Sequence, residues 1–215
     1  MEDMDYLRFI HNIFEFNDTA PAGKPYVPLS IKHTNKSPEV RLPEIQRKPR
    51  QLLVDVLAFC LMPNHFHFLL QQRRENGISE FMRKMGTGYT NFFNQKYQRS
   101  GSLFQGVYKR IQLTEQAHFL FLPYYIHLNP LDLIMPEWRE GYIENTRSAF
   151  QFLDSYRWSS YPDYINKKNF PSVTQRSFLQ DMLGSKPEQE QNIVEWIQRN
   201  KLEDIEHLIL ESPEV

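Results

Sequence analysis

The stretch AFCLMPNHFHFLL, residues 58–70, decides the fold, because it predicts two antiparallel strands joined by a tight turn. The first strand lies in the apolar run QLLVDVLAFCL at residues 51–61, whose length and β-branched content are typical of a buried strand. Met62-Pro63-Asn64 supplies the turn, and HFHFLLQQ at residues 65–72 returns as the second strand.

Side chains alternate between the two faces of a strand, and this separates the polar residues of HFHFLLQQ from the aromatic ones. One face is expected to carry Phe66, Phe68 and Leu70, and the other His65, His67 and Leu69. Two histidines on one face of an otherwise apolar strand are unusual, so the pair needs a structural or chemical explanation.

Helices are expected on both sides of this hairpin in the chain. Apolar residues at helical spacing predict helices over residues 3–17, 78–97, 115–129, 177–183 and 188–211. LFQGVYKRIQL at 103–113 is interpreted as a third strand, and residues 19–50 as a long proline-rich loop. This order favours an α+β sandwich with an antiparallel sheet in one layer.

Composition narrows the functional classes. The net charge of -1 means that any nucleic-acid contact must come from a local basic patch. The single cysteine, Cys60, excludes an internal disulfide framework and a cysteine-based zinc site. No run of about 18 apolar residues predicts a membrane span, and the acidic start MEDMDY lacks a signal-peptide pattern, so a cytoplasmic location is expected.

The histidine pair has two open interpretations. Imidazoles at positions i and i+2 of a strand are close enough to bind one divalent metal, with a third ligand from elsewhere. The alternative is that His65 and His67 are solvated or hydrogen-bonded in the core. A metallohydrolase of the H-x-H-x-D-H type would need aspartate at position 69, where this chain has leucine.

The stretch PYYIHLNP, residues 123–130, offers a nucleophile and a further ligand. Tyr125 and Asn129 are four residues apart, so on a helix they share a face. A tyrosine can form a covalent intermediate, and the amide oxygen of asparagine suits a hard cation such as Mg²⁺ or Mn²⁺. Aromatic pairs on helices more often pack in the core, a role that suits Tyr124 better. His127 is a further candidate, for proton transfer.

Four motifs in this order resemble those of the REP-associated tyrosine transposases, which belong to the HUH class of single-strand DNA endonucleases. They are AFCLMPNHFHFLL, GSLFQGVYKR, YIHLNP and YRWSSY, and the similarity spans residues 4–164. The resemblance implies a ferredoxin-like sandwich (the HUH endonuclease core) over residues 1–165, with a helical C-terminal extension over 166–215. The chain starts at a helix, where the family has a strand, so the family's first strand is expected to be missing.

The resemblance also implies an activity, namely DNA transposition by nicking and rejoining single-stranded or hairpin DNA. His65, His67 and Asn129 would bind Mg²⁺ or Mn²⁺, and Tyr125 would form a 5′-phosphotyrosine. One alternative is a truncated, inactive transposase that binds DNA hairpins without cleavage. Another is an unrelated metal-dependent phosphodiesterase, which would form no covalent adduct. The sequence does not decide between a monomer and a homodimer.

A local basic patch provides the expected DNA contacts. Residues 73–110 carry eight basic side chains against two acidic ones. We expect them to contact the phosphate backbone. The predicted DNA-binding residues are Arg73, Arg74, Arg83, Lys84, Lys96, Arg99, Lys109 and Arg110.

Overall fold

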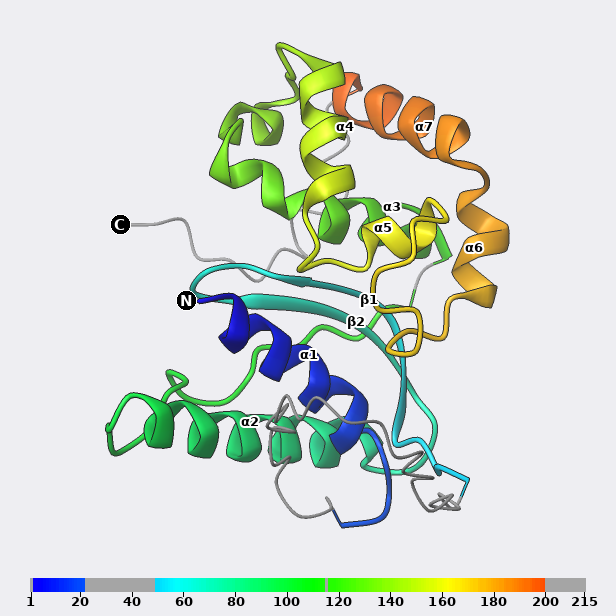
Figure 1. The fold of residues 1–215 in the computed structure, drawn as a ribbon. Coiled ribbons are helices and arrows are strands. Elements are labelled where there is room, and N and C mark those ends of the chain that lie inside the picture. Colours follow the sequence, from blue (N-terminus) through cyan, green and yellow to red (C-terminus); the bar gives the residue numbers. More distant parts are fainter. Residues whose placement is uncertain (1, 22–48, 115, 200–215) are drawn as a thin grey trace, which may run out of the picture.

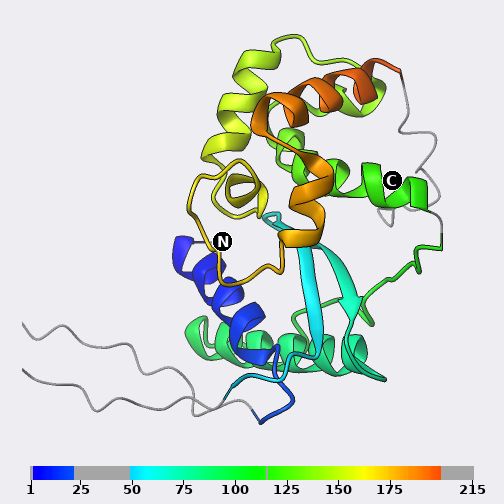
Figure 2. The same ribbon diagram turned by 90° about the vertical axis from the view of Figure 1, so that its right-hand side faces the viewer.

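The computed structural model describes residues 2–21, 49–114 and 116–199, and within them it has an α+β fold of two helical layers around one β-hairpin (Figure 1). Strands β1 (Val54–Leu61) and β2 (Phe66–Gln72) pair antiparallel, as predicted. Helices α1 (Asp3–Phe16) and α2 (Gly77–Lys96) lie on one side of the hairpin, and the elements from α3 onward lie on the other (Figure 2). No helix in the described ranges is long and apolar enough to cross a membrane.

The second helical layer contains the remaining elements. They are α3 (Gln116–Leu128), the 3₁₀ helices η1 (Asn129–Leu133) and η2 (Pro136–Glu140), α4 (Thr146–Ser155), α5 (Tyr161–Tyr164), α6 (Ser177–Leu183) and α7 (Lys186–Gln198). Leu179 of α6 and Trp196 of α7 belong to the same apolar cluster as the α3 residue Leu128. The C-terminal helices therefore share a core with α3. A separate extension beginning at residue 166 stays a prediction.

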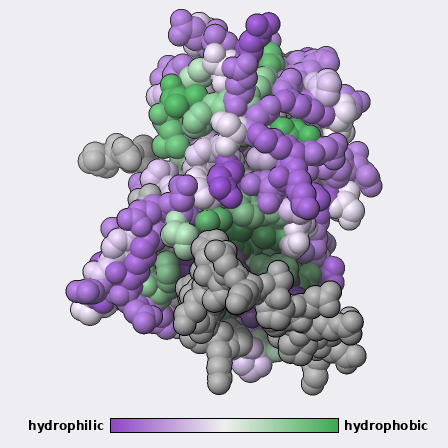
Figure 3. Space-filling view, in the orientation of Figure 1, coloured by the Kyte–Doolittle hydropathy of each residue, from purple (hydrophilic) through white to green (hydrophobic). Residues whose placement is uncertain are grey.

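The hairpin has one apolar cluster on each face. Phe66, Phe68 and Leu70 pack against the cluster formed with α1 and α2, whereas Leu69 belongs to the cluster formed with α3. The predicted alternation of the apolar side chains of β2 is therefore confirmed. On the face shown in Figure 3, hydrophilic residues predominate, and apolar residues are visible between the layers and among the upper helices.

The lower layer depends on close contact between α1 and α2. A Cβ atom at Gly88 of α2 would collide with the ring of Phe16 on α1, so a larger residue there would require that ring to move. At the other end of α2, Lys96 forms an ion pair with the buried Asp5 of α1, with 2.6 Å between Nζ and Oδ1.

The predicted third strand at residues 103–113 is wrong, because the structure has irregular backbone there. Leu103 packs against the lower cluster and Leu113 against the upper one, so this segment crosses from one layer to the other. Gly106, with φ of 81°, interrupts the apolar pattern in its middle.

The outer edge of β1 is covered by the segment that contains the motif YRWSSY. The backbone N–H of Leu61 donates to the carbonyl of Trp158 at 2.9 Å, and Ser160 N–H donates to the carbonyl of Phe59 at 2.9 Å. Trp158 also stacks on Tyr6 of α1, with ring centroids 4.7 Å apart. The segment therefore satisfies the strand edge and ties the C-terminal half of the chain to α1.

The predicted loop at 19–50 lies mostly outside the described residues, as does the predicted end of the last helix beyond residue 199. Two features of the middle region were not predicted. They are η2 and α4, and α4 follows Asn145, whose side chain accepts a hydrogen bond from the backbone of Ser148 at 3.0 Å. Asparagine is a preferred N-cap residue, so this signal was available in the sequence.

Candidate functional site

The β-hairpin brings His65 and His67 together. Met62 N–H donates to the carbonyl of His65 at 2.9 Å, which closes the turn, and Phe66 pairs with Leu61 at the start of β2. The two imidazole rings have centroids 4.9 Å apart and are nearly perpendicular, at 88°. Both Nε2 atoms are buried from solvent. The predicted proximity of the pair is therefore observed.

Asn64 orients the first histidine of this pair. Its Oδ1 lies 2.7 Å from Nδ1 of His65. Because an amide oxygen can only accept, this contact places the proton on Nδ1 and leaves Nε2 as an electron-pair donor. Metal-binding histidines are commonly oriented in this way. The sequence analysis had treated Asn64 only as a turn residue.

Helix α3 brings Tyr125 to the same face of the hairpin. The Tyr125 ring has its centroid 6.1 Å from that of His67, at an interplanar angle of 84°. Tyr125 is buried, with 2% of its surface exposed. Two residues that are far apart in the chain, one on β2 and one on α3, thus contact each other as the predicted site requires.

Asn129, at the start of η1, lies one helical turn after Tyr125, and its side chain is fully buried. Its Nδ2 donates to the carbonyl of Tyr125 at 2.8 Å, and its Oδ1 accepts from Nη2 of Arg139 at 3.1 Å. A carbonyl needs a donor and a guanidinium needs an acceptor, so these two contacts fix the orientation of the amide.

Arg139 of η2 is a member of the site that the sequence analysis missed. Its Nη1 donates to the hydroxyl oxygen of Tyr125 at 2.8 Å, and its Nε and Nη2 donate to the two carboxylate oxygens of Asp132 at 2.9 and 2.6 Å. Nothing in the stretch MPEWREG distinguishes this arginine from a solvated surface residue. Only the fold shows that η2 returns to α3.

The described residues fit a divalent metal in part. Two buried imidazole nitrogens on one strand face are suitable ligands for Mn²⁺ or Mg²⁺, though imidazole is the better match for softer ions. The amide oxygen of Asn129 already accepts from a cation, which disfavours a second cation on the same oxygen. Among the described residues, no group of three or more His, Cys, Asp or Glu side chains could hold a metal.

The neighbours of Tyr125 along α3 have structural roles. The Tyr124 hydroxyl accepts from Nδ2 of Asn192 on α7 at 3.3 Å, and burial raises the pKa of Tyr124. Nε2 of His127 lies 2.8 Å from Oγ of Ser160, and its ring contacts those of Tyr161 and Tyr164. Burial lowers the pKa of His127 to about 3, so it stays neutral at physiological pH. These contacts direct His127 into the core, not toward the Tyr125 hydroxyl.

Four of the predicted DNA-binding residues lie on α2 or just after it, in the lower helical layer. Helix α2, which carries Arg83, Lys84 and Lys96, lies across the hairpin from Tyr125. Arg99 follows this helix, and its guanidinium lies 5.7 Å from the Phe93 ring centroid. Lys84 donates to the backbone carbonyls of Asp18 and Ala20, and Lys96 pairs with Glu2 and Asp5.

The other four predicted DNA-binding residues lie outside α2. Arg73 pairs with Asp55 at 2.7 Å at the end of the hairpin, and the adjacent Arg74 is exposed. Lys109 and Arg110 are exposed on the segment that runs from the lower cluster to α3. These two are the predicted DNA-binding residues closest in the chain to the helix of Tyr125.

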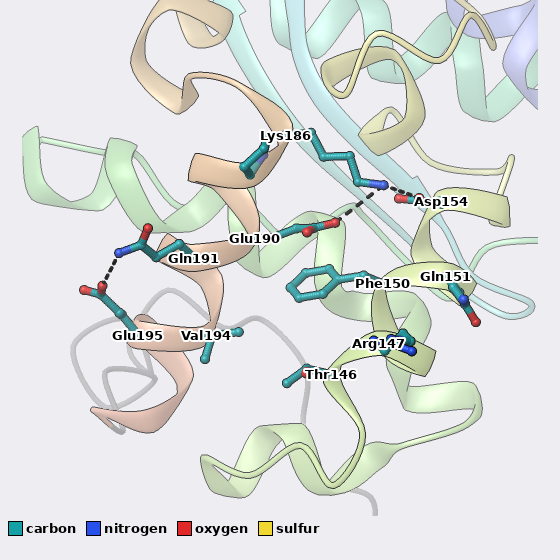
Figure 4. Close-up of a pocket in the computed structure, with 11 residues that line it drawn as sticks. Thr146, Arg147, Phe150, Gln151, Asp154, Lys186, Glu190, Gln191, Val194 and Glu195 are labelled. Carbon is teal, nitrogen blue, oxygen red and sulfur yellow. Dashed lines mark hydrogen bonds and ion pairs between the residues drawn. The ribbon is translucent and has the colours of Figure 1, made fainter.

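A pocket of about 560 Å³ lies between α4 and α7, and neither His65 nor His67 lines it (Figure 4). Lys186 extends across it to Asp154 and Glu190, and Phe150 supplies an apolar wall. Its lining contains neither a histidine nor a tyrosine. The pocket therefore has none of the groups that the predicted chemistry needs.

One of three comparisons with known proteins gives a match, and the matched range includes the hairpin and α3. The model of the family "Transposase IS200 like" matches residues 35–129, which include His65, His67, Tyr125 and Asn129. Comparison with curated proteins and with solved structures gives no match. The family match over both site-forming segments supports the assignment of this chain to the IS200-like transposases.

Proposed function

We propose that this chain nicks and rejoins single-stranded DNA next to hairpins, with Tyr125 as the nucleophile. The observation that carries the proposal is the contact between His67 of β2 and Tyr125 of α3, whose ring centroids are 6.1 Å apart. A helix-mounted tyrosine beside two imidazoles combines a rigid nucleophile with ligands for a cation. The match to a transposase family supports DNA as the class of substrate.

The chemistry would be a transfer of one phosphodiester linkage. The Tyr125 hydroxyl oxygen attacks phosphorus, the bond from phosphorus to the 3′ oxygen breaks, and a 5′-phosphotyrosine remains. The phenol loses its proton and the departing 3′ oxygen gains one. Because the energy of the phosphodiester is retained, attack by another 3′-hydroxyl rejoins the strand.

A divalent ion held by His65 and His67, with Mg²⁺ and Mn²⁺ as the expected choices, would polarise the phosphate and stabilise the negative charge that develops on it. The protein itself holds the reacting groups. Asn64 orients His65, α3 holds Tyr125 against His67, and Arg139 donates to the Tyr125 hydroxyl oxygen.

Covalent trapping tests the proposal. The purified chain is incubated with Mn²⁺ and labelled single-stranded DNA that carries hairpins from the flanking genomic sequence, and the products are separated on a denaturing gel. We expect a shifted protein–DNA band that is absent with a chelator and in Tyr125→Phe. Tyr124→Phe is the matched control, because Tyr124 is the preceding residue and contacts Asn192 on α7, so the band should persist.

Other outcomes of this assay have distinct meanings. Cleavage without an adduct would identify a phosphodiesterase and contradict the proposal, as would an adduct that survives in Tyr125→Phe. Hairpin binding with neither cleavage nor adduct would identify a non-catalytic DNA-binding protein. One observation favours this non-catalytic candidate. Arg139 contacts the Tyr125 hydroxyl and the Asn129 amide oxygen, which are the two groups of α3 and η1 that the reaction would use.

A further inference from the structure

The guanidinium of Arg139 is held in a defined plane. Its Nε and Nη2 form a two-point contact with the carboxylate of Asp132, at 2.9 and 2.6 Å. Oδ1 of Asp132 also accepts from Nε1 of the fully buried Trp138 at 2.7 Å. Two parallel hydrogen bonds between arginine and a carboxylate fix geometry as well as charge. Arg139 is therefore built into the fold, although about a quarter of its side chain is exposed.

The opposite edge of the same guanidinium contacts the candidate reaction groups. Nη1 lies 2.8 Å from the Tyr125 hydroxyl oxygen, and Nη2 lies 3.1 Å from Oδ1 of Asn129. One side chain thus sets the position of the hydroxyl relative to the amide. Neither Arg139 nor Asp132 belongs to the site that the sequence predicts.

We propose that Arg139, fixed by Asp132, is a positioning residue that holds the Tyr125 hydroxyl and the Asn129 amide and thereby weakens divalent-metal binding at Asn129. This inference rests on the proposed function, because it assigns a role within that site. In the arrangement observed, Asn129 contributes its oxygen to a guanidinium. This oxygen has two lone pairs and Arg139 occupies one, so a metal ligated by Asn129 would share the oxygen with a guanidinium.

Two physical effects of Arg139 both weaken the binding of a divalent metal at Asn129. The first is competition for the Asn129 amide oxygen, because its hydrogen bond to Nη2 occupies one of the two lone pairs and draws electron density away from the other. Repulsion between the guanidinium and a divalent ion only a few ångströms away is the second, and it is weakly screened at a buried site. The carboxylate of Asp132 offsets part of this repulsion. Removal of the guanidinium should therefore strengthen metal binding.

The test is a titration of the full chain with Mn²⁺ alone, followed by the electron paramagnetic resonance of free Mn²⁺. It uses wild type, Arg139→Gln and Arg139→Lys, each checked for folding by circular dichroism. We expect Arg139→Gln to bind Mn²⁺ about tenfold more tightly, a change that a few ångströms of like-charge separation can produce. Arg139→Lys keeps the charge, so its affinity should stay within about threefold of wild type.

A second background tests the route through Asn129. In Asn129→Ala, the added change Arg139→Gln should tighten Mn²⁺ binding by a smaller factor than it does in wild type, because the competition for the amide oxygen is gone and only the repulsion remains. Unchanged affinity in Arg139→Gln would overturn the inference, and so would full tightening in the absence of Asn129. Absence of Mn²⁺ binding in both wild type and Arg139→Gln would overturn it as well.

This titration contains no DNA, so its result is independent of the trapping assay. Failure to form a tyrosine adduct would contradict the proposed function and leave the expected Mn²⁺ affinities in place. Conversely, an adduct in wild type together with unchanged affinity in Arg139→Gln would support the proposed function and refute the role of Arg139.

Discussion

Asp5 of α1 and Lys96 of α2 form an ion pair at 2.6 Å, and the carboxylate of Asp5 is fully buried. Asp5 also accepts from the Tyr97 hydroxyl at 2.7 Å and from the Glu2 backbone at 2.9 Å. Burial alone would raise the pKa of Asp5, but these hydrogen bonds, led by that from Lys96, outweigh it and lower the pKa below 3.8.

Replacement of Asp5 by Asn should therefore destabilise the fold at pH 7 by about 2 kcal/mol, as expected for lost hydrogen bonds to a charged group. Because the folded-state pKa is depressed, the stabilisation is present above the unfolded value and is lost as the pH falls below about 3.8. Urea unfolding at pH 7 and pH 3 measures this. Asp3→Asn, at an exposed position of the same helical turn, is the control, and an equal loss in both variants would contradict the prediction.

The hairpin and the long helices could be predicted because their signals are local. The alternation in HFHFLLQQ and the helical spacing in residues 78–97 depend only on neighbouring residues. The family resemblance then related His65, His67, Tyr125 and Asn129, which periodicity alone could not bring together.

Two features could not be predicted from the sequence, namely the irregular backbone of residues 103–113 and the contact of Arg139 with Tyr125. An apolar stretch forms a strand only where it pairs with another strand, and residues 103–113 pair with neither β1 nor β2. Arg139 reaches Tyr125 because η2 turns back on α3, which is a tertiary relationship. Neither outcome is encoded in the local pattern of the segment concerned.

Lys109 and Arg110 should contribute directly to DNA binding, since both are exposed on the segment that leads from α2 to the helix of Tyr125. The double change to alanine should weaken single-stranded DNA binding. It should also reduce the slope of log affinity against log salt concentration by about 0.7 for each phosphate that is no longer neutralised. Fluorescence anisotropy over a range of salt concentrations measures both. Lys168→Ala, at an exposed position, is the control, and an unaltered salt slope in the double variant would refute the prediction.

Lys84 should instead act mainly on stability. Its Nζ donates to the carbonyls of Asp18 and Ala20 at 2.5 and 3.0 Å and pairs with Glu80 at 3.3 Å. Lys84→Ala should lower the free energy of unfolding by about 1–2 kcal/mol, because two carbonyls lose a charged donor. Arg83→Ala, at the exposed adjacent position, should leave stability within about 0.5 kcal/mol of wild type. A large loss of DNA affinity with unchanged stability in Lys84→Ala would show that Lys84 acts in DNA binding and not in stability.

His67→Ala should abolish metal-dependent adduct formation and weaken Mn²⁺ binding by about tenfold or more, because one of two imidazole ligands is removed. Mn²⁺ titration and the trapping gel measure the two effects separately. His11→Ala on α1 is the matched control, since that helix lies across the hairpin from Tyr125. Equal Mn²⁺ affinities in the two variants would exclude His67 as a ligand.

His127 should make the fold sensitive to mild acid. Its pKa is lowered by burial to about 3 in the folded chain, against about 6.5 for an unfolded histidine. Between these values the unfolded state binds a proton that the folded state does not, so stability is complete above pH 6.5 and declines as the pH falls. At pH 5 this single group should cost about 2 kcal/mol.

Urea unfolding of wild type and His127→Gln at pH 7 and pH 5 isolates this contribution. The variant is expected to be less stable at pH 7, because the hydrogen bond with Ser160 is altered, but to lose about 2 kcal/mol less than wild type on acidification. If wild type and His127→Gln lost the same stability between pH 7 and pH 5, His127 would have to be protonated within the core, and its neutral pairing with Ser160 would be wrong.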